Sequence, residues 1–184
     1  MPPKIKVTKE DIVNAAVEIV RTQGAWALNA RNVAQALHCS TQPVFSNFAT
    51  MDALRRAVIE CADALCQTYY QTEIEKAEFP PYKAKGMGYI RFAKEEKELF
   101  KLLFMRDRSG EDTSAEDSAT EAIVRQNTGL DEASVKLFHL EMWAYVHGIA
   151  TMSATGFLNL ERSLISKMLT DAYNGLKKQY GIEE

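Results

Sequence analysis

The sequence predicts an all-α protein in which a small three-helix head precedes a larger helical body. Apolar residues recur at helical spacing in successive segments along the whole 184-residue chain. The chain has only 9 Gly and 5 Pro residues, which leaves little room for the many turns of a β fold. An apolar fraction of 46% is enough to build a core. We expect the head to cover residues 1–50 and the body residues 51–184.

The first predicted helix begins after Thr8, which forms a capping pattern with Asp11 three residues later. Gly24 is the expected C-cap of this helix. Between the two caps, a single apolar stripe follows the i, i+3, i+4, i+7, i+8 spacing, at Ile12, Ala15, Ala16, Ile19 and Val20. The stripe predicts one buried face for this helix.

Residues 29–48 predict a helix-turn-helix. Asn29 is the expected cap of a short helix, residues 38–40 form the turn, and Ser40 is the expected cap of a second helix that ends near Asn47. The second helix is rich in short polar side chains, namely Thr41, Gln42, Ser46 and Asn47. Side chains of this kind read base edges in a major groove, so the motif indicates DNA recognition. An ordinary helical corner is the alternative interpretation.

Six helices are predicted in the body, and their expected ranges are 51–77, 82–94, 96–104, 119–127, 132–155 and 160–180. Thr50, Asp131 and Asn159 are the expected caps of the first and the last two. These last two helices carry more than one apolar stripe, which is more apolar surface than one chain covers by itself. The sequence therefore predicts a homodimer whose interface includes Leu137, Leu140, Leu169, Ala172 and Leu176. Two interior helices of a monomer are the alternative.

Charge is distributed unevenly between the head and the body. Residues 1–56 hold seven basic and four acidic groups, a net charge of +3, whereas the whole chain has a net charge of −3. A basic head on an acidic body orients a protein towards a polyanion, head first. A chance distribution of a few charges is the alternative explanation.

The sequence also predicts a cytoplasmic protein without a membrane-spanning segment. No apolar run approaches 18 residues, and residues 1–6 lack the apolar stretch of a signal peptide. Three cysteines, Cys39, Cys61 and Cys66, fit reduced thiols better than a framework of disulfides.

No catalytic or metal-binding pattern occurs in the sequence. It has no Gly-x-Ser-x-Gly, His-Glu-x-x-His or Cys-x-x-Cys motif. His139 and His147 are eight residues apart, which separates them by roughly 12 Å along a helix axis and is too far for a shared metal. We therefore expect no enzymatic activity, no metal and no cofactor.

The helix-turn-helix and its surroundings resemble the TetR family of bacterial transcriptional regulators. The resemblance is most specific in residues 8–48 and in the abrupt entry into a long helix at residues 48–54. Residues 143–148 also resemble the Trp-…-His-Gly motif of one subgroup of the family. The resemblance implies a homodimeric, ligand-responsive repressor with a DNA-binding head (1–50) that recognises a palindromic operator, and an effector-binding and dimerisation body (51–184).

The resemblance assigns operator contacts to the motif and its flanks, at Lys6, Arg31, Ser40, Thr41, Gln42, Phe45, Ser46, Asn47 and Arg55. Phe45 stands where the family usually has a tyrosine, and Met51 where many relatives have a lysine, so two phosphate contacts are lost. Arg55 or Arg56 is expected to offset the second loss. The two departures leave an alternative function, a helical effector-binding or scaffolding protein whose head no longer recognises DNA.

The resemblance further implies a pocket in the body for a small, largely apolar effector. The residues expected to line it are Tyr89, Phe92, Phe104, Trp143 and His147. Aromatic side chains between helices can equally be plain core packing, which is the alternative for each of these residues.

Overall fold

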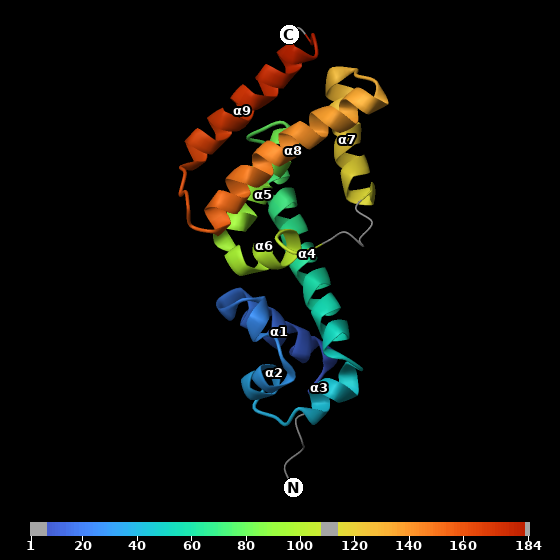
Figure 1. Ribbon diagram of the computed structural model, residues 1–184, viewed down its shortest axis with the longest axis vertical. Coiled ribbons are helices and arrows are strands. Elements are labelled where there is room, and N and C mark those ends of the chain that lie inside the picture. Colours follow the sequence, from blue (N-terminus) through green and yellow to red (C-terminus); the bar gives the residue numbers. More distant parts are fainter. Residues whose placement is uncertain (1–6, 108–113, 183–184) are drawn as a thin grey trace. The chain divides into compact units, whose positions relative to one another are not determined.

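A computed structural model describes residues 7–107 and 114–182 of the chain, and within these ranges it contains α-helices, one 3₁₀ turn (Ala25–Ala27) and no strand (Figure 1). The predicted all-α fold is thereby confirmed. In chain order the helices are α1 (Lys9–Gln23), α2 (Ala30–Ala36), α3 (Gln42–Asn47), α4 (Met51–Glu75), α5 (Pro81–Glu95), α6 (Lys97–Phe104), α7 (Ser114–Thr128), α8 (Glu132–Ala154) and α9 (Arg162–Gln179).

Contacts along the chain separate two compact units. Among the described residues, the head unit consists of 7–65 and 96–106, so it holds α1 to α3, the first part of α4, and α6. The body unit consists of 66–95, 107 and 114–182, and it holds the rest of α4, α5, and α7 to α9. These units describe packing, so the expected division of function after residue 50 stays a prediction.

Side-chain caps fix the ends of several helices where the sequence predicts them. Thr8 Oγ1 accepts a hydrogen bond from the backbone N–H of Asp11 (3.1 Å), and Asp11 accepts one from the N–H of Thr8 in return (2.9 Å). Asn29, Thr50 and Asp131 accept from the N–H groups of the first turns of α2, α4 and α8. Each cap satisfies a donor that has no acceptor within its helix.

Two predicted caps are wrong. α3 begins one residue later than a Ser40 cap requires, and Thr41 at its N-cap makes no side-chain hydrogen bond. A cap accepts from the second or third residue of a helix, and the second residue here is Pro43, which has no N–H. Asn159 is not a cap either, because α9 begins at Arg162.

Ala77, just after α4, has a backbone conformation that favours glycine. Its φ is +51°, in the left-handed region where a β-carbon is crowded. We expect Ala77→Gly to raise the free energy of unfolding by roughly 0.5–1 kcal/mol, measured by urea denaturation. Gly129, with φ of +69° and open space around it, is the matched control, and Gly129→Ala should lower stability by a similar amount. A less stable Ala77→Gly variant would contradict the assignment of strain.

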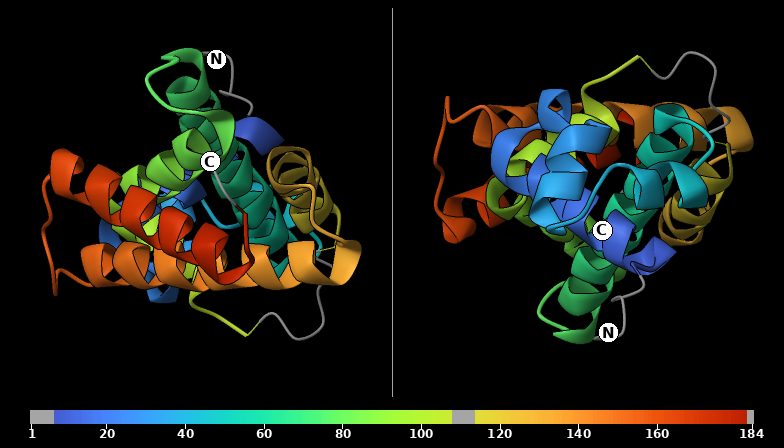
Figure 2. Two further views of the ribbon diagram at one scale, coloured as in Figure 1. Left: turned by 90° about the horizontal axis from the view of Figure 1, so that it is seen from above. Right: turned by 90° about the horizontal axis from the view of Figure 1, so that it is seen from below.

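In the body unit, α8 and α9 run side by side in opposite directions (Figures 1 and 2). Their inner faces, with α7, surround a buried cluster of Val124, Val135, Phe138 and Met142. α5 packs closely on α8 and also on α9. No helix in the described part of the chain is both long enough and apolar enough to cross a membrane.

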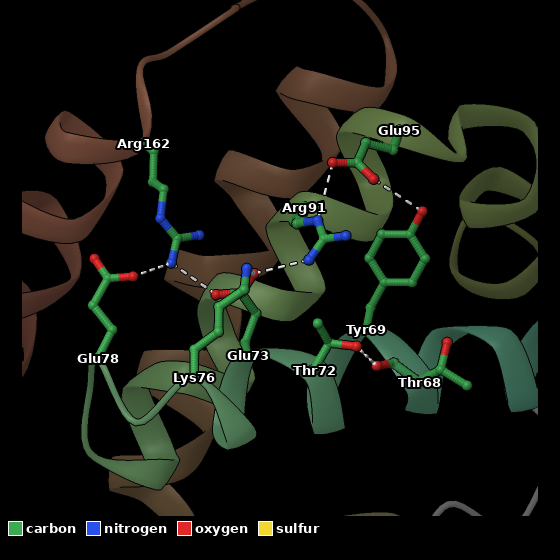
Figure 3. Close-up of polar contacts among 9 residues, drawn as sticks. All are labelled: Thr68, Tyr69, Thr72, Glu73, Lys76, Glu78, Arg91, Glu95 and Arg162. Carbon is green, nitrogen blue, oxygen red and sulfur yellow. Dashed lines mark hydrogen bonds and ion pairs between the residues drawn. The ribbon is translucent and has the colours of Figure 1, made fainter.

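Glu73, near the end of α4, is a carboxylate with no exposed side-chain surface, and three cations surround it (Figure 3). Its Oε1 accepts from Lys76 Nζ (2.7 Å) and Arg91 Nη1 (3.0 Å), and its Oε2 from Arg162 Nη2 (2.8 Å). We call these four residues the Glu73 cluster. Because Glu73 lies on α4, Arg91 on α5 and Arg162 on α9, the cluster ties three helices of the body unit together.

Neighbouring carboxylates balance the positive charge of the Glu73 cluster. Glu78 accepts from Arg162 (2.6 Å) and Glu95 from Arg91 (3.0 Å). Burial by itself would raise the pKa of Glu73, but the hydrogen bonds from Arg162, Lys76 and Arg91 outweigh it and lower that pKa from 4.5 to about 2. The carboxylate therefore stays charged at neutral pH.

Candidate functional site

The corner between α2 and α3 is held by backbone and side-chain bonds within the head unit. Asn32 Nδ2 donates to the carbonyl of Ala27 (2.7 Å), and the N–H of Cys39 donates to the carbonyl of Ala34 (2.9 Å). His38 supplies the turn with a φ of +50°. Underneath lies an apolar core made of Val33, Ala34, Val44 and Phe48. The corner presents the other side of α3 outward in a fixed orientation.

α3 exposes Gln42, Phe45, Ser46 and Asn47, while Val44 is fully buried. Gln42, Phe45 and Ser46 stand at i, i+3 and i+4, so their side chains are neighbours on one helix face. Phe45 is the large apolar member of this face, with 53% of its surface exposed. The amide of Asn47 donates to the carbonyl of Pro43 (2.8 Å) and is thus partly engaged within the helix.

Other residues assigned to DNA contact flank α3 in the sequence. Arg31 on α2, Ser40 in the turn and Arg55 on α4 are exposed, and Thr41 is half-buried. Arg55 Nη1 pairs with Asp52 Oδ1 at 3.1 Å. Lys6 lies outside the described residues.

In the body unit, three of the residues expected to line an effector pocket meet one another. Tyr89 Oη lies at hydrogen-bond distance, 2.8 Å, from Nδ1 of His147. The indole of Trp143 stacks on the His147 ring, with 4.8 Å between centroids and 10° between planes. Burial lowers the pKa of His147 below its ordinary 6.5, which keeps the imidazole neutral at pH 7.

The other two expected pocket residues make ring contacts elsewhere. Phe92 is completely buried and packs edge-on against Tyr69, at 5.3 Å between centroids. Phe104 belongs to the head unit, where its ring lies 5.2 Å from that of Phe100. Core packing, the alternative interpretation for each aromatic residue, accounts for these two ring contacts.

Sequence reasoning missed several partners of this aromatic group. The ring of Tyr70 on α4 stacks with Tyr89, at 6.3 Å between centroids, and Thr151 Oγ1 lies 3.3 Å from Nε2 of His147. A second pair of the same kind joins Tyr82 Oη and His139 Nδ1 at 3.1 Å. The seven-residue spacing of the tyrosines and the eight-residue spacing of the histidines are the signals that two such pairs cross between α5 and α8.

An apolar surface lies exposed on α8. Leu137, Leu140 and Trp143 are 50%, 57% and 44% exposed. Of the three α9 residues expected at a dimer interface, Leu169 is 3% exposed, and Ala172 and Leu176 are half-buried against the cluster around Phe138. We call Leu137, Leu140 and Trp143 the α8 surface, an exposed apolar area that a partner could cover.

Comparison with known families gives a match over residues 82–171, to the model described as the tetracyclin repressor-like C-terminal domain. The chain therefore carries a TetR-type C-terminal domain. The TetR-type domain thus begins at the start of α5 and includes the Tyr89, Trp143 and His147 group. No curated protein matches the chain.

Solved structures share the fold. A TetR-like transcriptional regulator from Rhodococcus sp. RHA1 has a TM-score of 0.69 at 16% identity, with 96% of this chain and 98% of that chain covered. The multidrug binding protein EbrR, complexed with imidazole, has a TM-score of 0.62 at 16% identity over 89% and 88% of the two chains. A TetR family member from Streptomyces coelicolor A3 has a TM-score of 0.63 at 17% identity over 89% and 96%.

Proposed function

We propose that the protein is a ligand-responsive transcriptional repressor that binds a palindromic operator as a homodimer. Residues 1–50 recognise the DNA, and residues 51–184 bind the effector and form the dimer. The observation that carries the proposal is the outer face of α3, where Gln42 and Ser46 are exposed above the buried Val44. A dimer with two such helices reads half-sites about 34–36 Å apart, or a multiple of that distance.

DNA recognition is tested by selecting duplexes from a random-sequence library with the full-length protein. Enriched duplexes should be near-palindromes, and gel shifts at two salt concentrations should show binding that weakens with salt. Gln42→Ala should then cost roughly 1–3 kcal/mol per half-site and relax the preference at one base pair. Gln126→Ala, which removes an exposed amide from α7 in the body, is the control.

The alternative function has a distinct outcome in the same experiment. If no duplex is enriched while the protein is folded, the head does not recognise DNA. A helical effector-binding or scaffolding protein would then be the better description of the chain.

We propose that the α8 surface forms the dimer interface with a second copy. In a symmetric dimer, Leu140 of both copies is buried at the interface, so Leu140→Glu changes the interface in two places. This variant should therefore raise the dissociation constant of the dimer at least about a hundredfold. Sedimentation at micromolar concentration should show the wild type as a dimer and the variant as a 20.7 kDa monomer. Met105→Glu, which alters an exposed apolar side chain of the head unit, should leave the dimer intact. A wild-type monomer would contradict the proposal.

We also propose that the effector is a small, largely apolar molecule that binds beside Tyr89, Trp143 and His147. Two rings and a hydrogen-bonding pair suit a ligand with an apolar body and one polar group. Small aromatic molecules that raise the melting temperature should also change operator affinity about 5–150-fold, the usual range of coupling between sites. Compounds that bind there without any effect on DNA affinity would contradict the coupling.

A further inference from the structure

Phe45 is an apolar ring on the face of α3 that otherwise carries polar groups. Its side chain is 53% exposed, whereas the neighbouring apolar residues Val44 and Phe48 are buried in the corner. Phe45 therefore contributes little to the core of the head. We propose that Phe45 reads the 5-methyl group of a thymine in each operator half-site. This inference rests on the proposed DNA-binding function and extends it by naming the base.

The neighbours of Phe45 direct its ring towards base edges. Gln42 precedes it by three residues and Ser46 follows it directly, and all three side chains are exposed on one side of the helix. If Gln42 and Ser46 reach into a major groove, the ring of Phe45 enters with them. Any contact that Phe45 makes with DNA is therefore expected to lie in the major groove.

The chemistry of the groove selects the partner of the ring. Base pairs present hydrogen-bond donors and acceptors in the major groove, and the 5-methyl of thymine is the apolar group among them. A phenyl ring makes no replacement hydrogen bond, so covering a polar edge would leave that edge desolvated. Covering a methyl group removes apolar surface from water on both sides and is favourable.

A phosphate is a poorer partner for Phe45. The face of an aromatic ring is negative, and the ring lacks the hydroxyl that would donate to a phosphate oxygen. The exposed guanidinium groups of Arg31 and Arg55 are better suited to that contact. Since Gln42 is suited to adenine, we expect the half-site to contain an adenine and a thymine close together.

The test uses an enriched duplex in which each thymine of the half-site is replaced singly by uracil. Uracil keeps the O4 acceptor and the base pairing, and it removes the methyl group alone. At one position, the replacement should weaken wild-type binding about fourfold, which corresponds to roughly 0.8 kcal/mol for one buried methyl group. When both half-sites are changed, binding should weaken about fifteenfold. The same replacement should change the affinity of Phe45→Ser by less than about 1.5-fold.

Two controls keep the result specific. Phe45→Leu retains apolar contact and should keep sensitivity to uracil at the same position. The helicity and melting temperature of Phe45→Ser should match those of the wild type, because the side chain is exposed.

Three outcomes overturn the inference. In the first, the wild type tolerates uracil at every position and Phe45→Ser leaves the affinity unchanged, so Phe45 makes no contact. In the second, the wild type tolerates uracil at every position but Phe45→Ser weakens binding to all duplexes alike, which indicates a backbone contact. In the third, Phe45→Ser keeps the full sensitivity to uracil, so another residue reads the methyl. If the wild type still binds an enriched duplex in any of these three cases, the repressor proposal is not contradicted. Failure to enrich any duplex removes the repressor proposal itself and this inference with it.

Discussion

Replacing Glu73 with alanine is expected to lower the free energy of unfolding by about 3 kcal/mol at pH 7. The variant leaves Lys76, Arg91 and Arg162 close together without their shared carboxylate. Breaking a buried ion pair usually costs 3–5 kcal/mol, and the three cations are 32–44% exposed, so water compensates them in part. Urea denaturation followed by circular dichroism measures the loss. Asp171→Asn, in an exposed pair with Lys167, should change stability by no more than about 0.5 kcal/mol.

The contribution of Glu73 should also have a definite pH dependence. A pKa of about 2 in the folded chain against 4.5 means that the unfolded state takes up the proton first as the pH falls. The stabilisation is therefore complete above pH 4.5 and is lost between pH 4.5 and 2, by about 3 kcal/mol in total. Glu73→Gln lacks this component, so the difference between wild type and variant should shrink across that window. A constant difference would contradict the role of the charge.

Replacing Gly88 with alanine is expected to destabilise the body unit by about 3 kcal/mol, the upper part of the range for overpacking. A β-carbon at this position would lie 2.8 Å from the carbonyl oxygen of Tyr69 and 3.0 Å from Cα of Tyr70. Both atoms are backbone of α4, so no side chain can rotate away, and the two helices must separate. Thermal and urea unfolding of the variant measure the effect.

Gly86 on the same helix is the matched control for Gly88. A β-carbon there would meet Leu169 Cδ1 at 3.5 Å and Val146 Cγ2 at 3.6 Å, which is ordinary contact. Alanine also favours a helix interior over glycine by about 1 kcal/mol, so Gly86→Ala should be neutral or stabilising. Equal losses at Gly86 and Gly88 would mean that the close approach of α4 and α5 is not the cause.

Local features of the fold were predictable from the sequence. The caps Thr8, Asn29, Thr50 and Asp131 act on backbone groups within one turn, so nearby residues suffice to identify them. The helix-turn-helix follows from such local signals too. The prediction of a Ser40 cap was wrong because Pro43 lacks one of the N–H groups that a cap would bind.

Features that depend on distant residues were not predictable. The residues next to Glu73 in the sequence do not indicate that it is buried in an ion-pair cluster, because two of its partners, Arg91 and Arg162, stand 18 and 89 positions away. The requirement for glycine at position 88 comes from the close approach of the α4 backbone, which the sequence does not indicate. In the candidate site, aromatic character alone did not separate Phe92, which is fully buried and packs against Tyr69, from Tyr89, which contacts His147.

The stacking of Trp143 on His147 gives the protein an intrinsic fluorescent reporter. The other of its two tryptophans, Trp26, is 84% exposed in the head unit, so Trp26→Phe isolates the emission of Trp143. An imidazolium quenches indole emission more strongly than a neutral imidazole, and the lowered pKa of His147 moves this quenching below pH 6.5. A second copy that covers the α8 surface would instead shift the emission to shorter wavelength. The intensity of the Trp143 emission thus reports the protonation of His147, and its wavelength reports the association of two copies.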